Sequence, residues 1–206
     1  MPLPNRVTPF GVMEASPARG SFMGNRGCLV DGRGRLVRRW RGERWLICRL
    51  EFRGRRRYPL MAPGRYTELF FMDEATALAA GHRPCRECRR VDLETFRTAW
   101  LNVHPDDAGS LTVLDRRLHG QRTAGVPWSA RCETLPDGAM VALRGAAWLV
   151  LGGSVLAWSH AGYTSCRPRP SGAVDVITPP STVAVLACGW TPHLHPSAYA
   201  QANPPR

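Results

Sequence analysis

The chain has 206 residues, and 44% of them are hydrophobic, which is enough to bury the core of one domain or of two small ones. This composition excludes a peptide that needs disulfides to fold, and the longest apolar run, "AAWLVL", is far shorter than the roughly 20 residues of a membrane span. All 28 basic residues are arginine, and 16 acidic residues leave a formal net charge of +12. Because the start "MPLPNRVTPFG" lacks the regions of a signal peptide, we expect a cytoplasmic protein without a membrane partner.

The first part of the chain predicts an extended arm followed by β structure. The first 27 residues are rich in proline, glycine and asparagine, which is typical of an arm wrapped on the body of a protein. The next stretch, "GRLVRRWRGERWLICRLEFRGRRRY", predicts a hairpin that turns near Gly42, and its alternating side chains place Cys48 on the buried face. A further strand is expected in "YTELFFM".

Three helices are expected in the middle of the chain. Asp73 is a favourable N-cap for a short helix over residues 74–80, which Gly81 would end. Hydrophobic residues at helical spacing predict a second helix after Asp92 and a third after Ser110.

The second half predicts a small antiparallel sheet that opens at the turn "LPDG". Its strands are expected at residues 139–143, 146–151, 155–159 and 173–178. The expected fold class is therefore α+β: a β-hairpin and helix unit, two linking helices, and a C-terminal antiparallel meander with a closing helix. We expect a division into the arm, a unit of residues 28–103 and a unit of residues 104–206, and the units can pack as one domain.

Two cysteines stand two residues apart in "GHRPCRECRR", at Cys85 and Cys88. Such a pair brings two thiolates within reach of one tetrahedral ion and commonly forms half of a structural zinc site. Two other interpretations stay open. The neighbouring arginines could lower the thiol pKa values and make the pair reactive, or the cysteines could be buried without a metal.

The stretch "FFMDEATALAAGHRPCREC" resembles the segment that supplies two zinc cysteines in the Ada-type methylphosphotriester-DNA repair domain. In that domain a strand with two phenylalanines, a short alanine-rich helix and a G-aromatic-R-P-C-x-x-C loop occur in this order, and here His82 replaces the aromatic residue. The resemblance covers about residues 44–90 and implies a zinc-bearing unit that acts on DNA. The whole chain also resembles a bacterial protein family in which "MGNRG", "TELFF" and "GHRPC" occur together, which implies no activity.

The Ada-type domain has two further cysteines upstream, and the resemblance implies that Cys48 is the third zinc ligand. The fourth cysteine has no counterpart, because Phe52 stands four residues after Cys48. We expect His119 to be the fourth ligand, with Cys28 and His82 as alternatives. Because methyl transfer in that family depends on four thiolates, the resemblance predicts a zinc-bearing fold better than it predicts this reaction.

The arginine excess predicts a polyanionic partner, because guanidinium groups bind phosphates and stack on bases. Arginine-rich codon usage would explain the absence of lysine but not the net charge. The stretch "LEFRGRRRY" places arginines at a hairpin tip, close to Trp40, Trp45 and Tyr58, which could stack on bases. The expected nucleic-acid contacts are Arg53, Arg55, Arg56, Arg57, Arg86, Arg89 and Arg90.

Catalytic residues are harder to find. Asp115 and His119 stand four apart on a predicted helix and could bind a hydrolytic cation, but no paired-carboxylate or His-Asn-His motif surrounds them. We therefore expect a nucleic-acid-binding protein, with DNA as the favoured partner and zinc as a structural cofactor. A DNA-processing enzyme, either a nuclease or a thiolate-based repair protein, and a small basic interaction protein stay open as alternatives.

Overall fold

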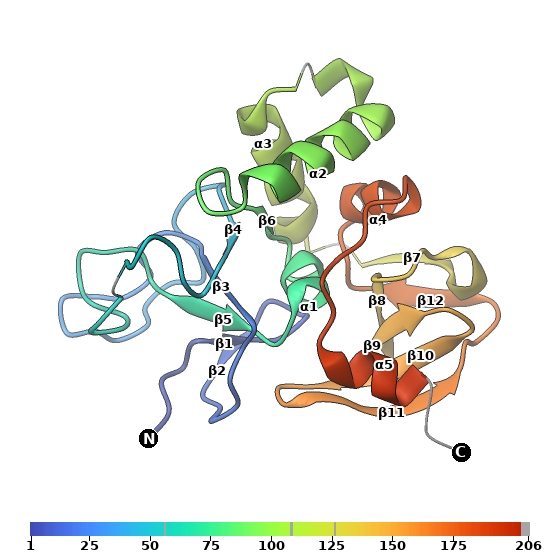
Figure 1. Cartoon of the computed structure of the whole chain (residues 1–206), viewed down its shortest axis with the longest axis horizontal. Helices are drawn as coiled ribbons and strands as arrows, with labels where there is room; N and C mark the ends of the chain where they lie inside the picture. Colours follow the sequence, from blue (N-terminus) through green and yellow to red (C-terminus); the bar gives the residue numbers. More distant parts are fainter. Residues whose placement is uncertain (56, 108, 126, 203–206) are drawn as a thin grey trace.

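The computed structural model describes residues 1–55, 57–107, 109–125 and 127–202. These residues form five α-helices and two six-stranded sheets, which lie on opposite sides of the molecule (Figure 1). The predicted α+β fold class is confirmed, including the antiparallel meander in the second half. Among the helices in the described part of the chain, none combines the length and the apolar composition needed to cross a membrane.

The N-terminal sheet has the strand order β2-β1-β5-β3-β4-β6. Its strands are β1 (Arg6–Val7), β2 (Met13–Glu14), β3 (Phe22–Asn25), β4 (Leu46–Cys48), β5 (Leu69–Phe71) and β6 (Arg83–Pro84). The predicted hairpin around Gly42 is wrong, because β4 pairs with β3 of the predicted arm, and the arm supplies three strands. Gly24 permits this pairing, since a Cβ there would lie 2.3 Å from the carbonyl oxygen of Leu46.

Helix α1 (Glu74–Ala79) lies between the two sheets and contacts strands of both (Figure 1). The predicted N-cap is confirmed, because a carboxylate oxygen of Asp73 accepts the Thr76 N–H at 2.9 Å. The other oxygen accepts the hydroxyl of Tyr163 at 2.8 Å and the N–H of His195 at 3.1 Å. Burial raises the pKa of Asp73. Residues from the C-terminal half therefore fix the start of α1.

The two linking helices follow the Cys-x-x-Cys pair, and both are confirmed. They are α2 (Arg90–Val103) and α3 (Leu111–Thr123), joined through the 3₁₀ helix η1 (Pro105–Asp107). Helix α2 begins two residues before the expected cap at Asp92, and α3 begins directly after Ser110, as expected. Two later helices, α4 (Pro180–Ala187) and α5 (Pro196–Ala202), follow the second sheet, and α4 packs against α2.

The C-terminal sheet is antiparallel, with the strand order β11-β10-β9-β8-β12-β7. Its strands are β7 (Trp128–Arg131), β8 (Met140–Leu143), β9 (Ala146–Leu151), β10 (Ser154–Ser159), β11 (Gly162–Pro168) and β12 (Ala173–Val176), and the 3₁₀ helix η2 (Cys132–Thr134) follows β7. The four expected strands are present. Strands β7 and β11 were not expected. Strand β7 has only four residues, and β11 is exposed over most of its length and carries no alternating hydrophobic pattern.

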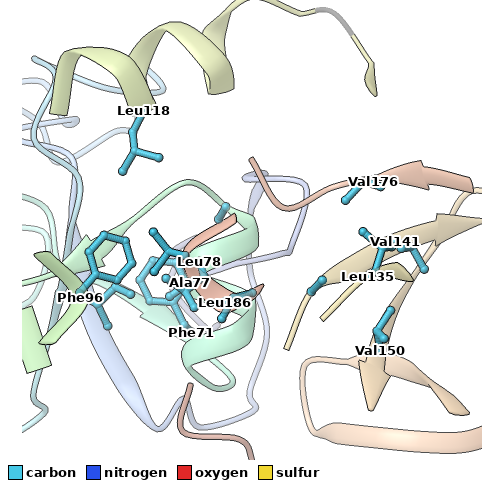
Figure 2. Close-up of a cluster of buried hydrophobic side chains, with 14 of the residues drawn as sticks. Phe71, Ala77, Leu78, Phe96, Leu118, Leu135, Val141, Val150, Val176 and Leu186 are labelled. Atoms are coloured by element: carbon cyan, nitrogen blue, oxygen red, sulfur yellow. The ribbon is translucent and has the colours of Figure 1, made fainter. Parts of the chain in front are cut away.

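One hydrophobic core connects the two halves (Figure 2). Phe71 of β5, Leu78 of α1 and Leu118 of α3 belong to the same buried cluster as Val141 of β8 and Leu186 of α4. The cluster therefore continues across residue 104, where the sequence suggested a boundary between two units.

Candidate metal centre

Two parallel strands bring the predicted cysteines together. Strand β4 ends at Cys48, and β6 ends one residue before Cys85. The Ile47 carbonyl accepts the Cys85 N–H at 2.9 Å, so both cysteines lie at the C-terminal ends of paired parallel strands. The following turn places Cys88 beside them, and the three Sγ atoms all lie within 4.8 Å of one another.

Backbone N–H groups support two of the sulfurs. Glu87 donates to Cys85 Sγ and Arg49 donates to Cys88 Sγ, each at 3.4 Å. Hydrogen bonds of this kind favour the thiolate and orient a sulfur that binds a metal. Hydrogen bonding from Cys48 and Cys88 lowers the pKa of Cys85, and the same contact raises the pKa of Cys48. A bound cation would favour the deprotonated form of all three thiols.

The group can hold a metal ion. Sulfurs bound to one ion at about 2.3 Å must lie less than about 4.6 Å apart, and the three cysteines are already close to this spacing. All three are buried, and side chains of Leu46, Phe52, Tyr66 and Phe70 pack against them. Phe52, for which the resemblance implied a cysteine, thus packs against the group.

None of the expected fourth ligands joins the three thiols. His119 places Nδ1 3.0 Å from a guanidinium nitrogen of Arg122, and buried His82 accepts a hydrogen bond from Arg26 at 3.2 Å. The thiol of Cys28 donates to a backbone carbonyl two residues away. Within the described ranges, no further histidine, cysteine or carboxylate belongs to the group, and three cysteines leave one position of a tetrahedral ion open.

The two catalytic candidates do not form a site. Asp115 is buried, and its two oxygens accept hydrogen bonds from Arg83 at 2.8 and 2.7 Å. Its carboxylate neutralises a buried guanidinium and is therefore not free to bind a cation or to accept a proton. His119 faces Arg122, and burial together with this positive charge lowers the pKa of the imidazole.

The exposed members of the predicted nucleic-acid contacts are Arg53, Arg55, Arg86 and Arg90. Arg55 forms an ion pair of 2.6 Å with Glu87, which lies between the two cysteines of the pair, and Arg90 pairs with Glu94 at 3.0 Å. Arg57 is half-buried and donates to the carbonyl of Leu50. Arg56 lies outside the described residues.

Arg89 is not available to a nucleic acid, and its predicted contact is wrong. Its side chain is 1% exposed and forms ion pairs with Glu74 and with Asp92. Its guanidinium also lies 4.9 Å from the centroid of the Phe22 ring. The sequence gives no sign of this role, because Glu74 at a helix start has the pattern of an exposed acid that favours the helix dipole.

Sequence reasoning missed most of the basic surface. Residues 31–65 contain twelve of the 28 arginines and only three acidic residues. These loops lie at the left end of the molecule in Figure 1. Trp40 and Tyr58 are 36% and 87% exposed there, whereas Trp45 is buried and cannot stack on a base. The further exposed arginines of the loops are Arg33, Arg35, Arg38, Arg39, Arg41, Arg44, Arg49 and Arg65. The density of arginine in this segment was the signal that could have found them.

Comparison of the chain with protein families, with curated proteins and with solved structures found no match. The resemblance to the Ada-type domain therefore rests on the motifs of residues 44–90 alone. The case for a function rests on the three cysteines and on the arginine-rich loops around them.

Proposed function

We propose that this protein binds nucleic acid, with DNA as the favoured partner, and that a structural zinc ion supports the binding loops. The observation that carries the proposal is the connection between the exposed arginines and the buried cysteines. Arg55 pairs with Glu87, which lies between Cys85 and Cys88, and Arg49 directly follows Cys48. Binding loops and metal ligands thus belong to the same short segments.

Zinc suits the three cysteines because it prefers thiolate ligands and has no redox chemistry of its own. Cys48, Cys85 and Cys88 would hold it. The loops after β4 contain little regular structure, so a bound ion would tie these loops to the ends of β4 and β6. Its function in this proposal is to fix the loops, not to react.

Exposed arginines bind phosphates with little desolvation cost, and the release of counterions makes such binding depend on salt. Residues 31–65 carry a large share of the excess positive charge, and Arg86 extends the surface next to the cysteines. Exposed Tyr58 adds an aromatic side chain that can stack on an unpaired base. These features support nucleic acid as the polyanion.

Titration of a fluorescent duplex at several salt concentrations tests the binding. We expect log Kd to depend linearly on log salt, with the slope falling by about 0.9 for each phosphate contact that is removed. Arg53→Ala and Arg86→Ala should each show this loss. Arg144→Ala is the matched control, because it removes the same charge from the turn between β8 and β9. Salt-independent binding, or an equal loss in all three variants, contradicts the proposal.

Metal analysis of protein purified under reducing conditions tests the zinc. We expect one zinc ion per chain in the wild type and in Cys166→Ser, which changes an exposed cysteine of β11. Cys48→Ser should lose the ion, because it removes one of three ligands. Wild-type protein without bound metal, or an equal loss in both variants, refutes the zinc site.

A further inference from the structure

A cavity of about 480 Å³ lies where the two halves of the molecule meet. Arg26 and Trp45 line it from the N-terminal half, and residues 121–123 line it from the end of α3. Trp128 of β7 and Val176 of β12 line it from the C-terminal sheet. It shares no residue with the three cysteines. Sites for small molecules often lie at such junctions.

Two guanidinium groups stand beside this cavity, over the ring of Trp45. The central carbon of the Arg26 guanidinium lies 4.1 Å from the ring centroid, and that of Arg122 lies 3.9 Å from it. Arg26 is 1% exposed, which is unusual for an arginine without an acidic partner. The cavity is thus lined by two positive charges that are largely removed from water.

Their partners within the protein are all neutral. Arg26 donates to the Gly11 carbonyl at 2.9 Å and to His82 at 3.2 Å. Arg122 donates to the Gly81 carbonyl at 2.7 Å and to the Glu43 carbonyl. Burial and the neighbouring arginines hold the pKa of His82 well below its usual range, so its imidazole adds no charge of its own.

Two guanidinium donors at this site have no acceptor. Arg26 Nη2 and Arg122 Nε are buried and make no hydrogen bond within the described part of the chain. The described residues that line the cavity include no aspartate or glutamate, and nearby Asp115 already neutralises Arg83. Burial is the main cause that lowers the pKa of Arg26 and of Arg122 to about 9. Buried charges without a counter-ion are costly, and a bound anion would remove this cost.

We propose that this cavity binds a phosphorylated organic ligand of about the size of a nucleoside monophosphate. Arg26 and Arg122 would hold the phosphate, because both side chains line the cavity and two guanidinium groups match a dianion. Arg39, which also lines the cavity, would add a third positive charge.

The cavity is much larger than a phosphate ion, which explains why an organic body is expected. Its remaining walls are mainly apolar and include Phe10, Trp40, Ala80 and Ile177. An aromatic or sugar group would lie against these walls while the phosphate meets the arginines. The ligand can be a free nucleotide or the phosphorylated end of a nucleic-acid strand, since both carry the same group.

Calorimetric titration of the full chain with adenosine 5′-monophosphate tests the proposal, with adenosine as the uncharged control. We expect saturable binding of the nucleotide that inorganic phosphate inhibits, and we expect no binding of adenosine. Arg39→Gln should weaken the binding about tenfold, because a hydrogen bond to a charged group is lost. Arg38→Gln is the matched control, since this exposed neighbour does not line the cavity and should leave the affinity unchanged.

Arg122→Gln provides a second variant, and circular dichroism establishes whether it is folded. The proposal is overturned if the wild type shows no saturable binding up to about 10 mM nucleotide, because a Kd above this concentration is too weak for a specific site. It is also overturned if Arg38→Gln and Arg39→Gln lose the same affinity, or if neither Arg39→Gln nor a folded Arg122→Gln loses any.

A pair of oligonucleotides, one with a 5′-phosphate and one with a 5′-hydroxyl, distinguishes the two sources. Tighter binding of the phosphorylated strand, lost in Arg39→Gln, assigns the cavity to strand ends. Equal binding of both strands, with nucleotide binding retained, assigns it to free nucleotides. Arg39 belongs to the arginine-rich loops as well as to the cavity, so the difference between the two strands, and not the total binding, separates this inference from the proposed DNA binding.

Discussion

Replacing Asp115 with alanine is expected to lower the free energy of unfolding by about 3–5 kcal/mol, because the buried guanidinium of Arg83 loses its counter-ion. Each of these side chains is 3% exposed, and they meet through two hydrogen bonds. After the substitution, the Pro84 carbonyl at 2.9 Å is the remaining acceptor of Arg83 in the described structure. Because domains of this size have a stability of about 5–15 kcal/mol, the loss should be easy to measure.

Urea unfolding followed by tryptophan fluorescence measures the change, provided that the m-value stays constant. The double variant Arg83→Met/Asp115→Leu should regain most of the stability, since it removes both charges and keeps the volume. Arg90→Ala is the control for an exposed pair with Glu94 and should cost less than about 1 kcal/mol. A decrease of less than about 1 kcal/mol in the free energy of unfolding of Asp115→Ala would refute the reasoning, because a buried charge without a counter-ion costs more than this.

Three further predictions concern ion pairs and the metal. Arg89→Met should destabilise the protein by about 3–5 kcal/mol, because it leaves the buried carboxylate of Glu74 without a positive partner, yet folded molecules should bind a duplex as the wild type does. The pKa of Asp107 is lowered by Arg117, so its contribution to stability is present above the ordinary pKa of about 3.9 and is lost as the pH falls through the lowered value. Urea midpoints of Asp107→Asn should therefore fall less on acidification than those of the wild type. A chelator should lower the Tm of the wild type and leave Cys48→Ser unchanged, and an equal effect on both would contradict a shared ion.

The helices could be predicted from the sequence because their signals are local. Asp73 and Ser110 stand directly before α1 and α3, and the hydrophobic spacing that follows needs no distant partner. The pairing of β3 with β4 could not be predicted in this way, because its partners are more than twenty residues apart. Gly24 looks like a loop residue in the sequence, whereas the structure uses it for close approach to Leu46.

The candidate site, like the fold, was predictable in part: the cysteines were predicted, but the burial of the arginines was not. The Cys-x-x-Cys pattern predicted two of the three thiols, and the resemblance to the Ada-type domain predicted Cys48 as the third. Composition predicted the excess of arginine, but it did not predict which arginine side chains are buried and which are exposed. Arg26 and Arg89 are buried whereas Arg86 is exposed, and the residue type alone does not show this difference, because tertiary packing causes it. Charge patterns therefore predict a partner class better than they predict the residues that touch it.

The start of α1 has a consequence for synthesis on the ribosome. The buried carboxylates of Asp73 and Glu74 receive hydrogen bonds from the backbone of residues 193 and 195, more than a hundred residues later. Until that segment leaves the exit tunnel, two acidic groups in the middle of the fold lack these partners. The N-terminal sheet can form earlier, but α1 cannot be buried fully against it. Release of nearly the whole chain therefore precedes completion of its first half.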